Sequence, residues 1–188
     1  MQKFSRTNEV FVGANGRESL LDITIPENWN KKLIIFSHGY MGYKDWGAWN
    51  LMQDFFVERN FGFLKYNVSH NGGTVENGID FPDLDAFSMN SYSKEMRDME
   101  TIIKYANENI EGIRYIHLIG HSRGGGMVLL QANHSKVSKI AALAPISDIS
   151  NRFPPEAELK DWQTKGIRFT TNGRTKQQMP HHYTQFED

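Results

Sequence analysis

The sequence has 188 residues, of which 39% are hydrophobic, 12% aromatic and 23% charged, and its formal net charge is −1. This composition allows one folded domain and argues against disorder, and the net charge near zero gives no indication of binding to nucleic acid. No cysteine is present, so disulfides and thiolate metal sites are excluded.

The N-terminal residues Met1 to Val10 mix charged and polar side chains and lack the apolar stretch of a signal peptide. Apolar runs elsewhere reach about seven residues, well short of the roughly 18 that a membrane-spanning helix needs. We therefore expect a cytoplasmic protein without a membrane partner.

The hydrophobic pattern up to residue 144 predicts strands that alternate with helices. In chain order the predicted elements are strands at 9–12, 20–25 and 33–37, a helix at about 46–59, a strand at 61–68, a loop at about 70–90, a helix at 92–110, a strand at 113–119, a turn at 120–126, a helix at 127–133 and a strand at 139–144. The helix at 92–110 is the clearest, because its apolar residues recur at intervals of three and four.

Alternation of this kind indicates an α/β fold with a doubly wound, mostly parallel sheet of at least six strands. In such sheets, ligands bind at the carboxyl ends of the strands. After residue 150 the chain is polar, and only a short helix near 156–165 is predicted. We therefore expect a core at 1–149 and a partial lid or cap with a C-terminal tail at 150–188.

The most specific motif is Gly120-His121-Ser122-Arg123-Gly124, which matches the G-x-S-x-G nucleophile elbow. An apolar strand is predicted before it and a helix after it, as that motif requires. The turn is so tight that small residues are needed at Gly120 and Gly124. The pattern favours Ser122 as a nucleophile over an ordinary glycine-rich turn.

A second glycine-containing loop follows the strand at 33–37, with the sequence His38-Gly39-Tyr40-Met41-Gly42. Acyl transfer needs two backbone donors for the oxyanion. We expect these to be the N–H groups of Arg123 and Tyr40, with Gly39 giving the loop its tight path. A plain turn is the alternative interpretation of this loop.

The segment from Ile35 to Gly47 and the elbow resemble those of bacterial α/β-hydrolases of the dienelactone-hydrolase-like and serine-esterase-like group. The resemblance continues through Ala144-Pro145 and, less specifically, through Trp162 and Asn172-Gly173-Arg174-Thr175. It implies hydrolysis of small carboxylic esters by a Ser–acid–His triad, without a metal or organic cofactor.

The chain order in that family is Ser, then acid, then His. We find no predicted strand pair after Ala144 for the last two sheet positions, so the sequence is expected to be C-terminally truncated relative to the family. Asp148 is a candidate acid, with a turn aspartate as the alternative. His181 and His182 are candidate bases, with solvated tail histidines as the alternative.

Two functions therefore remain open: a serine hydrolase, incomplete in this chain, and a non-catalytic binding module or inactive fragment. No His-Glu-x-x-His, P-loop or dinucleotide motif is present, so neither a metal site nor a cofactor is predicted. A homo-oligomer or a complementing C-terminal segment could supply the missing triad groups.

Overall fold

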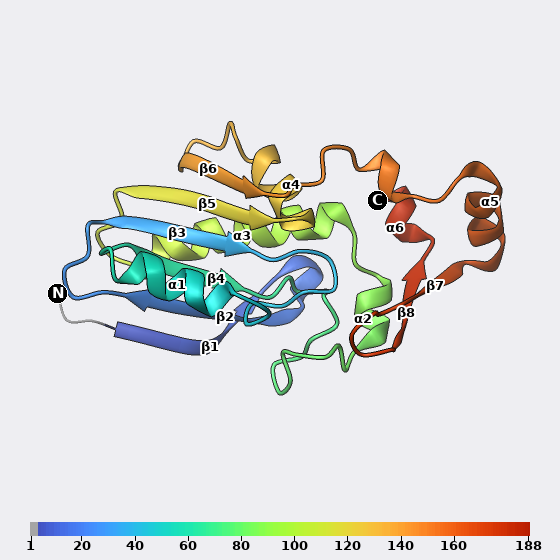
Figure 1. Ribbon diagram of the computed structural model, residues 1–188, viewed down its shortest axis with the longest axis horizontal. Helices are drawn as coiled ribbons and strands as arrows, with labels where there is room; N and C mark the ends of the chain where they lie inside the picture. Colours follow the sequence, from blue (N-terminus) through green and yellow to red (C-terminus); the bar gives the residue numbers. More distant parts are fainter. Residues whose placement is uncertain (1–3) are drawn as a thin grey trace.

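The computed structural model describes residues 4–188, and the first three residues of the predicted N-terminal segment lie outside this part. Six strands form the main sheet in the order β1-β2-β4-β3-β5-β6 (Figure 1). Their bounds are β1 Phe4–Val12, β2 Glu18–Ile25, β3 Lys32–Ser37, β4 Gly62–Tyr66, β5 Tyr115–His121 and β6 Val137–Leu143. The predicted six strands are thus confirmed, with β1 starting earlier than expected.

Pairing within the sheet is mixed. β3 runs parallel to β4 and β5, and β5 runs parallel to β6. β2 is antiparallel to both β1 and β4. The mostly parallel α/β sheet predicted from the sequence is therefore confirmed, and its antiparallel part is the N-terminal hairpin.

The residues of β3 alternate between two apolar layers, because successive strand side chains point to opposite faces. Leu33 and Ile35 belong to the larger core cluster, which helix α3 (Tyr92–Asn109) and helix α4 (Arg123–Leu130) cover. Ile34 and Phe36 belong to a smaller cluster under helix α1 (Trp49–Val57). Burial on both faces explains why the four central residues of this strand, Leu33 to Phe36, are all apolar.

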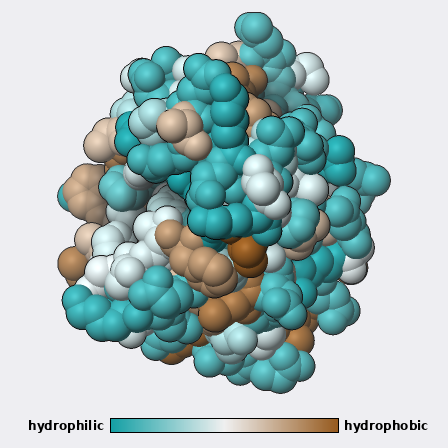
Figure 2. Space-filling view, turned by 90° about the vertical axis from the view of Figure 1, so that its right-hand side faces the viewer, coloured by the Kyte–Doolittle hydropathy of each residue, from teal (hydrophilic) through white to brown (hydrophobic). Residues whose placement is uncertain are grey.

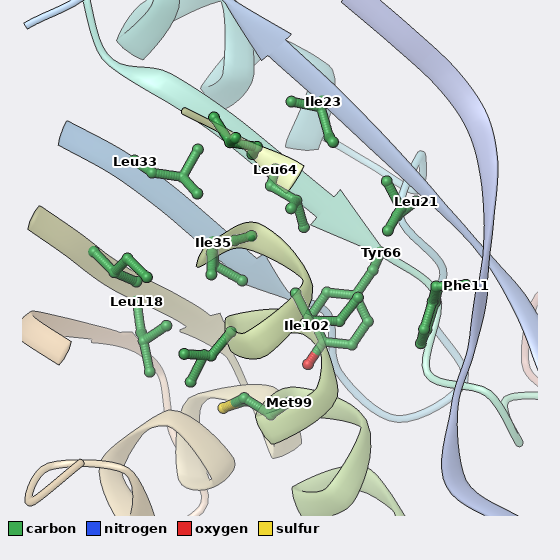
Figure 3. Packing of buried hydrophobic residues seen from close by; sticks show 14 of the residues in the cluster. Phe11, Leu21, Ile23, Leu33, Ile35, Leu64, Tyr66, Met99, Ile102 and Leu118 are labelled. Atoms are coloured by element: carbon green, nitrogen blue, oxygen red, sulfur yellow. The ribbon is translucent and has the colours of Figure 1, made fainter. Parts of the chain in front are cut away.

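Figure 3 shows the larger cluster, in which Met99 and Ile102 of α3 lie against Ile35, Leu64 and Tyr66 of the sheet. Ser91 caps α3, because its side chain accepts a hydrogen bond from the N–H of Lys94. The predicted apolar stripe of this helix is confirmed as core.

Two local predictions were wrong. Helix α4 begins at Arg123 rather than at 127, directly after Ser122, so most of the predicted glycine-rich turn is helical. The predicted loop at 70–90 contains a short helix, α2 (Leu84–Ser88), which Asp83 caps by accepting a hydrogen bond from the N–H of Ala86.

Residues 150–188, which we call the lid segment, do not form a loose polar tail. They contain a short 3-10 helix at Ser150–Arg152, α5 (Glu156–Lys165), β7 (Ile167–Thr171), β8 (Gln178–His182) and α6 (Thr184–Glu187). β7 and β8 pair as an antiparallel hairpin that is separate from the main sheet. The sequence predicted α5 with its observed bounds but missed this hairpin.

The lid segment lies beyond the carboxyl ends of the parallel strands (Figure 1). Met179 of β8 is fully buried in a small apolar cluster with Phe81 and Phe87. Figure 2 looks onto this side of the molecule and shows a largely hydrophilic face with hydrophobic side chains gathered around its middle. Among residues 4–188, no helix combines the length and the apolar character needed to cross a membrane.

Candidate active site

Ser122 occupies the junction between β5 and α4, with φ 54° and ψ −115°. This conformation is rare for a residue with a side chain and costs on the order of 1–3 kcal/mol. The junction is held by three backbone hydrogen bonds. The N–H of Ser122 donates to Leu143 at 2.9 Å, and its carbonyl accepts from Gly126 and Ile146, each at 3.1 Å. The strained serine is therefore fixed between the two elements.

The glycines on either side of Ser122 leave no room for a side chain. A Cβ at Gly120 would overlap the carbonyl oxygen of Gly124, and a Cβ at Gly124 would overlap the carbonyl oxygen of His38. The second overlap arises because α4 begins directly against the end of β3. The steric need for glycine at 120 and 124, expected from the motif, is thus present in the structure.

The loop after β3 lies against the serine. A Cβ added at Gly39 would come within 3.0 Å of the Cβ of Ser122. Arg123 is the first residue of α4, so its N–H has no acceptor in the helix's own hydrogen-bond ladder. Among residues 4–188, the N–H of Tyr40 donates to no backbone carbonyl. Both predicted oxyanion donors are therefore close to Ser122 in the fold and lack a backbone acceptor.

Ser122 opens onto a cavity of about 340 Å³ between the core and the lid segment. Tyr40, Arg123 and His181 line the same cavity. A smaller cavity of about 90 Å³ is lined by Gly39, Tyr40, His121 and Ser122 among others. The structure thus brings together residues from the loop after β3, the elbow and β8.

His181 is 4% exposed, so the interpretation as a solvated tail histidine was wrong for this residue. Its Nε2 lies 2.8 Å from the phenol oxygen of Tyr40, and its Nδ1 lies 3.0 Å from Oε1 of Gln185. The amide nitrogen of Gln185 donates to the carbonyls of Phe87 and Ser88, which turns Oε1 toward the imidazole. Nδ1 therefore carries the proton, and Nε2 accepts from Tyr40.

Burial lowers the pKa of His181 to about 4, so the imidazole is neutral at pH 7. Trp162 stabilises the position of this residue, because its indole N–H donates to the His181 carbonyl at 2.8 Å. Among residues 4–188, no carboxylate contacts the His181 ring, and the side chain that contacts Nδ1 is the amide of Gln185.

The other two triad candidates lie outside the cavity lining. His182 contacts Thr184 through Nδ1 at 3.0 Å. Asp148 is exposed and accepts hydrogen bonds from the N–H and the hydroxyl of Ser150, at 2.8 and 2.6 Å, which lower its pKa. Asp148 therefore has the hydrogen bonds of a turn aspartate.

Several residues in or next to the cavity were not found from the sequence. Glu95 of α3 forms an ion pair with Arg123 at 2.9 Å, and the Arg123 guanidinium lies 3.9 Å from the ring centre of Tyr92. Arg168 and Gln185 come from the lid segment, whose hairpin was not predicted. The alternation of Ile167, Phe169 and Thr171 before an Asn-Gly turn is the signal that could have found it.

No protein-family model matches the sequence, and no curated protein matches it. Solved structures do share its fold. Est1E from Butyrivibrio proteoclasticus with bound ferulic acid is 16% identical, with a TM-score of 0.69 over 95% of this chain and 69% of that chain. A putative hydrolase from Agrobacterium vitis is 17% identical, with a TM-score of 0.71 over 100% of this chain and 70% of that chain.

A dienelactone hydrolase from Anabaena variabilis is 14% identical, with a TM-score of 0.59 over 74% of this chain and 62% of that chain. Identities this low show the fold and not the reaction. The chain therefore has the α/β-hydrolase fold and spans between 62% and 70% of the length of these three structures.

Proposed function

We propose that this chain carries the nucleophile of a serine hydrolase that cleaves small carboxylic esters. The observation that carries the proposal is the strained backbone of Ser122. This residue lies at the N-terminus of helix α4 and lines a cavity. Strain of this kind persists where the surrounding structure holds it, and it is common at active sites. The putative hydrolase and the dienelactone hydrolase with the same fold support hydrolysis as the reaction.

In the proposed reaction, Ser122 Oγ attacks the ester carbonyl carbon and its proton passes to a base. The N–H groups of Tyr40 and Arg123 stabilise the negative oxygen, and each such donor is worth about 100-fold to 1,000-fold in rate. The C–O bond to the alcohol then breaks, and the alcohol leaves with the proton. Water releases the acyl group from Ser122 in the second half of the reaction.

Within the described residues, the base best supported by position is His181, because it lines the same cavity as Ser122. For His181 to accept the serine proton, its Nε2 must exchange the Tyr40 hydroxyl for Ser122 Oγ. A pKa of about 4 and a glutamine in place of the acid make it a weak base. We therefore expect slow turnover. We also propose that residues 150–188, which supply His181, act as the lid over this site.

The glutamine at His181 also favours a second candidate function, a binding module that keeps the fold without the triad. Hydrolysis of p-nitrophenyl butyrate separates the two. We expect slow release of p-nitrophenol by the wild type and none above background by Ser122→Ala. Equal rates for the two proteins would exclude Ser122 as the nucleophile and would favour the binding module.

A further inference from the structure

Three arginines line the cavity in front of Ser122, namely Arg123, Arg152 and Arg168. No aspartate or glutamate is among its lining residues. A guanidinium group keeps its positive charge at all ordinary pH values. The cavity wall is therefore strongly positive, in a protein whose formal net charge is −1.

Only one of these charges is balanced. Arg123 pairs with Glu95, which is itself buried. Within residues 4–188, neither Arg152 nor Arg168 has a carboxylate oxygen within 4.0 Å. His181 is neutral and adds no negative charge. Two guanidinium groups in the cavity wall thus form no ion pair with these residues, and the carboxylates of Glu158 and Asp148 interact with Arg168 and Arg152 only over longer distances.

Arg168 is the more deeply placed of the two. It lies on β7 two residues before Thr170, and both line the cavity, because alternate strand residues share a face. It is paired across the hairpin with His181. Its guanidinium carbon lies 4.3 Å from the ring centre of Trp162, which fixes its plane. The structure therefore holds this side chain against the cavity.

The Nε of Arg168 is buried and has no hydrogen-bond partner. A buried charged donor without a partner is costly, so such groups are normally satisfied by an acceptor. Guanidinium groups bind carboxylates through paired hydrogen bonds. A bound molecule cannot reach this buried nitrogen, but within residues 4–188 the two terminal nitrogens of Arg168 are accessible and donate to no protein acceptor, so they are the atoms that a carboxylate in the cavity can contact.

We propose that the cavity selects esters that carry a second, anionic group, with a carboxylate bound by Arg168 and assisted by the more exposed Arg152. This inference rests on the proposed function for the position of the reacting ester at Ser122. Tyr92, Ile146 and Phe153 give the carbon skeleton of the substrate an apolar surface within the same cavity. The substrate class is thus a monoester of a dicarboxylic acid or a related anionic ester.

Binding can be tested without turnover in the Ser122→Ala background. The probes are monomethyl glutarate, which is anionic, and dimethyl glutarate, which is neutral, titrated by calorimetry. We expect the anionic probe to bind at least about 10-fold tighter, the value of one charge-assisted hydrogen bond. Added salt should reduce that preference.

Adding Arg168→Gln should abolish the preference, and Arg168→Lys should keep part of it, since the charge remains without the paired geometry. Arg174→Gln is the matched control. Arg174 follows β7 in the same hairpin and pairs with Asp80 at 2.6 Å, away from the cavity lining. We expect this variant to keep the full preference.

Equal affinity for the two probes, no binding of monomethyl glutarate, or a preference that survives Arg168→Gln would overturn the proposal. The wild type is then assayed with mono-p-nitrophenyl glutarate and p-nitrophenyl pentanoate. If monomethyl glutarate binds more tightly than dimethyl glutarate but neither p-nitrophenyl ester is hydrolysed, the proposed reaction is refuted and the anion site is supported. Equal turnover of both esters would keep the reaction and refute the anion site.

Discussion

The phenol oxygen of Tyr40 lies 2.8 Å from Nε2 of His181, although 141 residues separate them in the chain. Their rings also stack, with centres 5.8 Å apart. Tyr40 belongs to the loop that offers an oxyanion donor, and His181 belongs to the lid hairpin. This contact therefore connects the lid to the loop beside Ser122 and occupies the nitrogen that a catalytic base would use.

Tyr40→Phe removes this hydrogen bond but keeps the ring and the backbone N–H. Because Nε2 of His181 is then free to accept the serine proton, we expect Ser122 to react faster with a fluorophosphonate than in the wild type. The free energy of unfolding should fall by about 1 kcal/mol, the usual worth of one hydrogen bond. Labelling reactions quenched at successive times measure the rate of reaction with the fluorophosphonate. Urea denaturation measures the change in the free energy of unfolding.

Tyr43→Phe is the control for this change, since Tyr43 lies in the same loop and contacts Phe81 instead of His181. We expect its labelling rate to equal that of the wild type. A labelling rate in Tyr40→Phe that is unchanged or lower would argue against His181 as the base.

His181 should make stability depend on pH. Burial holds its pKa at about 4 in the folded protein, below the ordinary value of 6.5. The folded state therefore binds this proton less readily than the unfolded chain does, so the stability from neutral His181 is present above pH 6.5 and is lost as the pH falls toward 4. His181→Gln should lose less stability between pH 7 and pH 5, by about 2 kcal/mol.

Urea denaturation at the two pH values measures this difference. His38, whose pKa burial lowers to about 4, and Asp98, whose pKa burial raises to about 6, titrate in both proteins. Their effects cancel in the comparison. An equal loss of stability in the wild type and in His181→Gln would show that His181 is not buried as described.

The elbow glycines should not tolerate a methyl group. Gly120→Ala places a Cβ against the carbonyl of Gly124, so α4 must move away from β5. We expect a loss of about 3 kcal/mol or more in the free energy of unfolding. Gly173→Ala is the control, because a Cβ there has no atom within 4 Å. Similar stabilities for the two variants in thermal unfolding would contradict the close approach at the elbow.

Gly39→Ala tests the oxyanion loop with less effect on the fold. Its Cβ would come within 3.0 Å of the Ser122 Cβ, so the loop must shift and move the Tyr40 N–H away from the serine. We expect kcat for p-nitrophenyl butyrate to fall about 100-fold, as when one oxyanion donor is lost. Turnover at the wild-type rate would show that this loop does not supply a donor.

The sequence was sufficient to predict the sheet and the elbow because their residue requirements are local. Leu33 to Phe36 is continuously apolar since both faces of β3 are covered, and a glycine at 120 is required by the carbonyl of Gly124, only four residues away. Such signals depend little on the rest of the fold.

The lid hairpin could not be predicted with the same certainty, because the residues that bury its strands are distant in the sequence. β8 contains Pro180, a residue that argues against a strand, and its buried Met179 contacts Phe81 and Phe87 nearly 100 residues earlier. The environment of His181 likewise depends on Tyr40 and Gln185 meeting in three dimensions. Hydrogen bonds between residues so far apart in the chain leave no periodic pattern in the sequence.

The central claim is that Ser122 is a reactive nucleophile, and covalent labelling tests it most directly. The wild type is incubated with a fluorophosphonate probe, and the adduct is located by peptide mass spectrometry. We predict one adduct, on Ser122, that is absent after heat denaturation and absent in Ser122→Ala. A protein that stays unlabelled, or that is labelled equally in Ser122→Ala, would contradict the proposed function.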